Sequence, residues 1–138
     1  MNYLKPTLSI FIILITLSSC LKSTISPTIT TYPIQGLWVG TYKDFNLDTS
    51  FFYSLSVHPG GNLSFEAKSI NNVIYFGPGT WTLKADTFKF VVSSNYSGTP
   101  LVQTGVAVFD STKGTLSKGL VSDPARGTTA IWSMKKIN

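Results

Sequence analysis

Residues 50–70 read SFFYSLSVHPGGNLSFEAKSI, two alternating segments on either side of a turn. In the first segment, Ser50–His58, every second residue from position 51 to 57 is large and apolar, and the residues between are mostly serine. In the second, Leu63–Ile70, apolar residues again alternate with polar and charged ones. A period of two is typical of a strand with one buried face. Because the glycines of Pro59–Asn62 can supply the positive φ of a tight turn, the stretch predicts an antiparallel β-hairpin.

The same pattern continues on both sides of this hairpin. Short runs of β-branched and aromatic residues are separated by Gly, Asn, Asp and Pro, and no window has a helical period. Further strands are expected at 36–43, 73–84, 87–93, 101–110, 115–122 and 127–136. One of them is interrupted by Gly77-Pro78-Gly79, which predicts a bulge, a sharp bend or an edge position because proline cannot donate to a ladder.

About eight strands with short connections predict an all-β domain, residues 36–138, built as an antiparallel up-and-down meander. Closing such a meander removes its exposed edges. About eight strands give an interior that side chains fill or that holds one small ligand. We therefore expect a closed or nearly closed barrel. A two-layer β-sandwich is the alternative, and the barrel is favoured because no long connection of the Greek-key kind is present.

The N-terminal residues have the parts of a secretory signal in the expected order. Lys5 supplies a positive charge, Leu8–Leu17 is a ten-residue apolar run, and two serines follow it. A membrane-spanning helix needs roughly 20 residues, so the run is too short to span. Leu17-Ser18-Ser19-Cys20 resembles the lipobox of bacterial lipoproteins. The resemblance implies that residues 1–19 are a signal peptide and that Cys20 becomes the acylated first residue.

Residues 20–35 are then the acylated cysteine and a tether rich in Ser, Thr and Pro. The alternative is that Ile25, Ile29 and Ile34 pack on the domain as an extra strand. The resemblance implies a membrane as partner, through the lipid on Cys20, and a place in the envelope of a diderm bacterium. No Asp follows Cys20, so the inner-membrane retention signal of some bacterial lipoproteins is missing. The resemblance therefore implies the outer membrane, on its periplasmic or surface face.

Charge and cysteine content exclude other classes. From Cys20 onward the chain has ten Lys and Arg against six Asp and Glu, a net charge of +4. The basic residues are scattered and form no stripe that could follow a phosphate backbone, so nucleic acid is not an expected partner. A weak attraction to anionic lipid headgroups or glycans stays open. The single cysteine cannot form an internal disulfide, so the domain must be stable through its core alone.

Gly36-Leu37-Trp38, at the start of the first strand, resembles the Gly-X-Trp signature of the lipocalins and wider calycin barrels. In that family the tryptophan plugs one barrel end beneath an arginine, which implies a contact between Trp38 and Arg126, the only arginine of the chain. Gly79-Thr80-Trp81 looks like the Gly-Thr-Trp of small lipocalin-like domains in bacterial lipoproteins. The lipocalin Thr-Asp-Tyr motif and the Asn and Gly-Ser residues of biotin-binding barrels are absent.

The residues needed for catalysis are not grouped in the sequence. The single histidine, His58, lies at a strand end, and the aspartates fall in or beside turns, where they cap local backbone. Glu66 alternates outward beside Lys68. One histidine and no free cysteine cannot build an ordinary zinc site. We expect no enzyme activity, no metal and no cofactor apart from the covalent lipid on Cys20.

The remaining candidate site is the barrel interior. Alternation places nine large side chains inside: Trp38, Phe51, Tyr53, Leu55, Phe65, Trp81, Phe88, Phe90 and Trp132. They either line a pocket for a small hydrophobic ligand, with Tyr53 or Tyr75 at its mouth, or fill the core, which is favoured. The leading hypothesis is a non-enzymatic binding or structural accessory protein of the envelope. The alternatives are a lipocalin-like carrier and a module that binds an envelope protein through its strand edges and residues 94–100.

Overall fold

The two alternating segments around Pro59–Gly61 form neighbouring antiparallel strands, and Gly60 and Gly61 both have positive φ, 74° and 82°. The structure is a computed structural model that describes residues 31–96 and 98–137. Its strands are β1 (Gly36–Asp44), β2 (Phe51–Val57), β3 (Asn62–Lys68), β4 (Ile74–Lys84), β5 (Thr87–Tyr96), β6 (Thr99–Asp110), β7 (Thr115–Asp123) and β8 (Thr128–Lys136). A 3-10 turn, η1 (Pro59–Gly61), joins β2 to β3.

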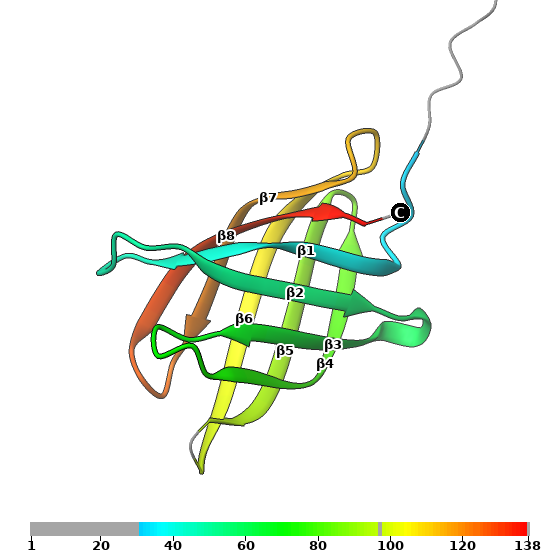
Figure 1. The fold of residues 1–138 in the computed structure, drawn as a ribbon. Helices are drawn as coiled ribbons and strands as arrows, with labels where there is room; N and C mark the ends of the chain where they lie inside the picture. Colours follow the sequence, from blue (N-terminus) through cyan, green and yellow to red (C-terminus); the bar gives the residue numbers. More distant parts are fainter. Residues whose placement is uncertain (1–30, 97, 138) are drawn as a thin grey trace, which may run out of the picture.

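The eight strands close into an antiparallel barrel in sequence order (Figure 1). β1 pairs with β8 from Trp38 opposite Lys136 to Asp44 opposite Ala130, so each of the eight strands has a neighbour on both sides. The predicted meander and barrel are confirmed, and the sandwich alternative is wrong. Short connections leave each strand beside the next, and pairing of the first strand with the last removes both edges.

The barrel has two ends, which we name the closed end and the open end. At the closed end β1 begins, β8 finishes, and the β2–β3, β4–β5 and β6–β7 connections turn. At the open end lie the β1–β2, β3–β4, β5–β6 and β7–β8 connections. Figure 1 shows the cyan segment before β1 and the end of β8 together at the closed end. The segment before β1 therefore enters the barrel at the closed end.

The Gly77-Pro78-Gly79 interruption is a bend within a continuous strand. β4 keeps its register with both neighbours, without a bulge. Its ladder to β5 starts at Gly79 opposite Val92, so Pro78 has a ladder partner on β3 alone. Figure 1 shows β4 turning in its middle from the direction of β3 towards that of β5. The register shifts lie elsewhere, between β6 and β7 and between β7 and β8, where Lys118 has a φ of 52°.

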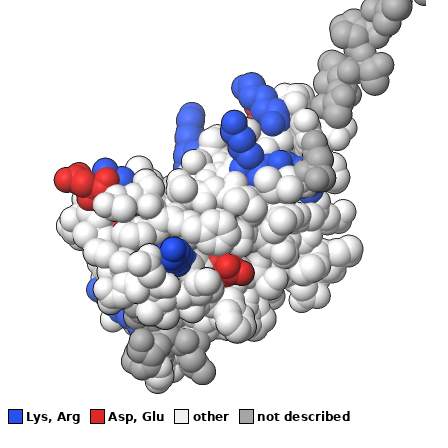
Figure 2. Space-filling model, viewed as in Figure 1, with Lys and Arg blue, Asp and Glu red and all other residues white. Residues whose placement is uncertain are grey.

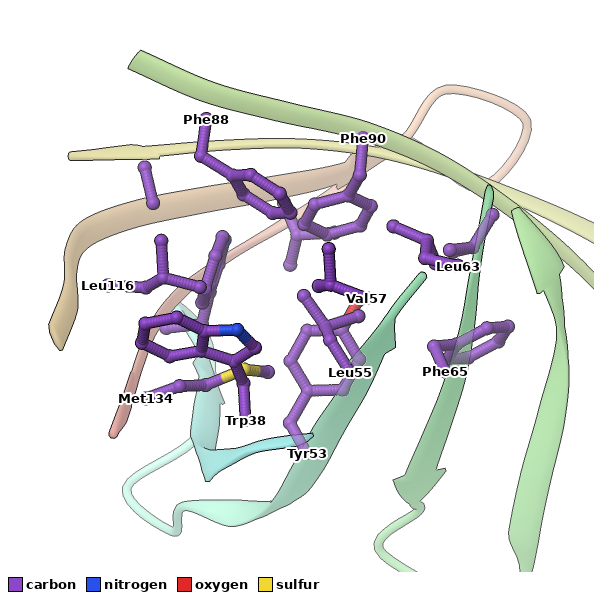
Figure 3. Close-up of a cluster of buried hydrophobic side chains, with 14 of the residues drawn as sticks. Trp38, Tyr53, Leu55, Val57, Leu63, Phe65, Phe88, Phe90, Leu116 and Met134 are labelled. Carbon is purple, nitrogen blue, oxygen red and sulfur yellow. The ribbon is translucent and has the colours of Figure 1, made fainter. Parts of the chain in front are cut away.

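Aromatic rings fill the middle of the barrel (Figure 3). The rings of Tyr53, Phe90 and Trp132 contact one another with centroid separations of 5.6–6.4 Å. Gly105 lies opposite Phe90 and Gly119 lies opposite Trp132 on neighbouring strands. A side chain at either glycine would collide with the facing ring, since an added Cβ would be 2.2 Å and 2.4 Å from ring atoms. The glycines make the room that these large rings occupy.

The folded domain reaches back beyond Gly36. The Tyr32 amide donates to the Ser111 carbonyl at 2.7 Å, and Ile34 packs against the core. Residues 32–35, which were expected to belong to the tether, therefore lie against the closed end of the barrel. The signal peptide, Cys20 and the rest of the expected tether up to residue 30 lie outside the described residues.

Candidate functional site

Trp38 closes one end of the barrel. Its side chain is fully buried, meets Phe109 edge to face at 5.8 Å, and donates from Nε1 to the Ile34 carbonyl at 2.7 Å. The Lys136 ammonium lies 5.2 Å from the centre of the Trp38 ring and donates to the carbonyls of Pro33 and Gln35. Burial lowers the pKa of Lys136. These contacts tie the segment before β1 across the closed end.

The structure does not bring Trp38 and Arg126 together. Arg126 lies between β7 and β8 at the open end, where its Nε is 3.6 Å from a carboxylate oxygen of Asp123. The register explains the difference, because Trp38 is opposite Lys136, at the far end of β8 from Arg126. The cation over the Trp38 ring is Lys136, so the contact implied by the family resemblance is made by a different residue.

The open end contains a pocket of about 210 Å³ that enters the barrel. Tyr42, Phe51, Tyr53 and Tyr75 supply its aromatic wall. Its remaining lining is Asp44, Leu47, Ser69, Ile70, Leu101, Gln103, Val121, Asp123, Arg126, Thr128 and Ala130. Inward positions towards this end are thus both polar and apolar, whereas those of the core are apolar. An aromatic concavity with a few convergent polar groups is the usual form of a small-molecule site.

A short chain of hydroxyl groups runs along one wall of the pocket. The Tyr75 hydroxyl donates to the Tyr42 hydroxyl at 3.4 Å, and the Tyr42 hydroxyl donates to the Lys68 carbonyl at 3.1 Å. The Tyr42 ring also contacts Phe51 and Tyr53, at 5.5 Å and 5.7 Å between centroids. The packing and the hydrogen bonds hold these rings in fixed positions around the opening.

Another wall of the pocket carries an ion pair. Asp123 is 2 % exposed, accepts a hydrogen bond from the Ala125 amide at 3.1 Å, and faces Arg126 across the 3.6 Å contact. A buried carboxylate is tolerated when a cation and a hydrogen bond compensate it. The pair places one charged group of each sign at the pocket.

Two buried polar atoms of the lining lack hydrogen-bond partners among the described residues, the Tyr53 hydroxyl and Gln103 Oε1. Tyr53 is 2 % exposed, and burial raises the pKa of its hydroxyl far above the ordinary value, so the group stays a neutral donor. An unpaired buried polar group costs about 1–3 kcal/mol. A water or ligand that reached these atoms would remove that cost.

Exposed apolar side chains lie in the connections at the open end. Four apolar side chains at this end are each about half exposed or more. They are Phe45 in the β1–β2 connection, Ile70 and Val73 in the β3–β4 connection, and Ile74 at the start of β4. Ile70 also lines the pocket itself. The open end therefore combines exposed hydrocarbon with the exposed Arg126 and Thr128 of the pocket lining.

A larger hollow of about 840 Å³ lies mainly along the outer wall. Its lining includes outward residues such as Ser56, Glu66 and the exposed Phe76, and one buried hydroxyl without a described partner, that of Ser94. Most of this lining consists of outward strand positions, so the hollow cannot surround a ligand as the barrel interior can. The smaller pocket at the open end is the better candidate site.

The sequence-predicted interior residues separate into two groups. Trp38, Leu55, Phe65, Phe88, Phe90 and Trp132 are buried in the core, whereas Phe51 lines the pocket. Tyr53 belongs to both groups, because it is buried in the core and also lines the pocket. Trp81 is half-buried, stacks on Phe88 at 6.1 Å and donates from Nε1 to the His58 carbonyl at 2.9 Å. His58 itself is exposed.

Sequence reasoning missed the polar residues of the pocket, above all Tyr42, Gln103 and Asp123. Alternation could have found Gln103, because it falls two residues after the inward Leu101 and two before Gly105. The sequence places Asp123 in a turn, and its bond to the Ala125 amide fits that role. Its burial against the pocket depends on closure of the barrel.

Within residues 31–96 and 98–137, no three His, Cys, Asp or Glu side chains are grouped as metal ligands would be. The same residues form no apolar helix of membrane-spanning length. No family model, curated protein or solved structure matches the chain.

Proposed function

We propose that the protein is a lipid-anchored, non-enzymatic binding protein of the cell envelope, whose barrel takes a small molecule at its open end. The observation that carries this proposal is the pocket of about 210 Å³ whose lining holds two buried polar atoms without described partners. The core beneath it is filled by rings. Most buried polar groups in proteins are hydrogen-bonded, so these two atoms are candidate partners for a ligand.

The size and lining of the pocket limit the ligand. Small-molecule sites usually have volumes of about 300–1,000 Å³, so a pocket of about 210 Å³ supports a ligand smaller than most. The rings of Tyr42, Phe51 and Tyr75 favour a planar apolar part, and Gln103 and Tyr53 favour at least one hydrogen-bonding group. Carriage of a large hydrophobic molecule inside the barrel is the less favoured alternative, because aromatic rings occupy that space.

The position of the chain's N-terminal segment supports an anchored arrangement. Tyr32 and Ile34 are held at the closed end, and the lipobox-like Cys20 precedes them in the sequence. A lipid on Cys20 would attach the barrel through the end opposite the pocket. The pocket would then face away from the membrane and remain accessible to a ligand.

The binding proposal predicts that a bulky residue at the rim abolishes ligand retention. Thr128 is exposed and lines the pocket, whereas its neighbour Thr129 is on the outer face. We expect mass spectrometry to detect a co-purified small molecule with the native protein and with Thr129→Trp, but not with Thr128→Trp. Recovery of the same molecule from all three proteins, or of none from the native protein, would contradict binding at this pocket.

The anchoring proposal predicts that Cys20 carries the lipid. Cells grown with a clickable palmitate analogue should label the wild-type protein, and Cys20→Ser should lose that label and leave the membrane fraction, because the substitution removes the thiol that accepts the lipid. Ser19→Ala is the matched control: it keeps a small residue before Cys20 and should keep the label. Label that persists in Cys20→Ser would rule out acylation at this cysteine.

A further inference from the structure

The excess positive charge of the domain lies at one end of the barrel. The closed end carries Lys84, Lys89, Lys113, Lys135 and Lys136 against Asp86 and Asp110, a balance of +3. The open end carries Lys43, Lys68 and Arg126 against Asp44, Asp48 and Asp123, a balance of zero. Glu66 and Lys118 lie farther along their strands, and their opposite charges cancel. Figure 2 shows basic side chains gathered beside the point where the chain leads into the barrel.

Three of these lysines are available to a partner. Lys84, Lys89 and Lys135 are exposed, and none forms an ion pair within residues 31–96 and 98–137. Lys113 is 3.1 Å from Asp110, and Lys136 is engaged with the Trp38 ring and backbone carbonyls. Hydrogen bonds from Thr112 and Lys113 hold the pKa of Asp110 at about 2, so Asp110 stays charged and is already matched.

The same end receives the chain that leads from Cys20. Eleven residues, 21–31, separate Cys20 from Tyr32, whose amide is bonded to the closed end. A fully extended segment of this length spans at most about 40 Å. If Cys20 carries a lipid, as proposed above, the closed end is the part of the barrel held nearest to the membrane.

We propose that the closed end of the barrel docks on an anionic lipid surface through Lys84, Lys89 and Lys135, which holds the pocket away from the bilayer. Headgroup charges act on basic residues within a Debye length, about 10 Å at 0.1 M salt. Each basic residue near an anionic leaflet strengthens binding about fivefold. The open end has no net charge, so the same surface does not attract it, and the barrel has one favoured orientation.

The test uses residues 20–138 with Cys20→Ser, sedimented with vesicles of phosphatidylcholine alone or with 30 mol% phosphatidylglycerol. The entire tether is present, but no lipid is attached, so the result does not depend on acylation. We expect at least about tenfold stronger partitioning to the anionic vesicles at 0.05 M salt, and loss of this preference at 0.5 M salt.

Two triple variants with equal charge changes separate a docking face from general attraction. Lys84→Gln/Lys89→Gln/Lys135→Gln should lose about tenfold or more of the preference for anionic vesicles. Lys43→Gln/Lys68→Gln/Lys118→Gln, which leaves Lys84, Lys89 and Lys135 in place, should stay within about twofold of the parent. Equal losses in both variants, or no preference in the parent, would overturn the proposal. The vesicle measurements do not depend on ligand retention, so the membrane-docking proposal and the ligand-binding proposal can fail independently.

Discussion

Replacing Trp38 with alanine should lower the free energy of unfolding by about 3–5 kcal/mol, the usual loss for a buried tryptophan or phenylalanine. Trp38 is fully buried and contacts Phe109, and its Nε1 bond to Ile34 ties down the segment before β1. The variant leaves a cavity at the closed end and leaves Lys136 without the ring beneath it. It should therefore also release residues 32–35 from the barrel.

Urea unfolding followed by far-ultraviolet circular dichroism measures the first effect, and amide exchange at Tyr32 measures the second. Trp81→Ala is the matched control, because Trp81 is half-buried and bonds the His58 carbonyl at the same end of the barrel. It should destabilise the protein less and leave exchange at Tyr32 unchanged. Equal effects of the two substitutions would mean that Trp38 has no special part in closing this end.

Replacing Gly105 with alanine should destabilise the barrel by about 1–3 kcal/mol, the range for overpacking a filled core. An added Cβ would lie 2.2 Å from two atoms of the Phe90 ring, well inside van der Waals contact. Phe90 cannot move freely, since its ring also contacts Phe88 and Trp132. The strain must therefore spread through the aromatic cluster or separate β5 from β6.

A double-mutant cycle with Phe90→Leu isolates this contact. Leucine lacks the ring that faces Gly105, so Gly105→Ala should cost less than half as much in the Phe90→Leu background as in the wild type. Equilibrium unfolding of the four proteins measures both values. The same cost in both backgrounds would show that alanine acts at this position through the backbone and that the ring is not the reason for the glycine.

Much of the fold follows from local patterns in the sequence. The alternation in residues 50–70 predicts both strands and their hairpin, and the turn residues between later segments predict the remaining strands. Short connections then leave a meander as the simplest topology, which the structure confirms. The strand count predicts closure of β1 on β8, but their register, with Trp38 opposite Lys136, is not encoded in either strand alone.

The candidate site is less predictable. Alternation places Phe51 and Phe90 inside, yet Phe51 lines the pocket and Phe90 is buried in the core. The difference depends on how far each residue lies from the open end once the strands are staggered. Gln103 and Asp123 become site residues for the same reason, because closure brings β6 and β7 beside Tyr53 of β2 around one opening.

The strand pattern, the antiparallel meander and the lipobox-like Cys20 can all be read from the amino-acid sequence, because each depends on residues within short segments. Only the folded barrel shows which of its ends is closed, which cation covers Trp38 and where the pocket opens. Those features depend on register and closure, which bring together residues as distant as Trp38 and Lys136. The stretch at residues 50–70 specifies a hairpin, but its neighbours in space give Tyr53 a place at the pocket.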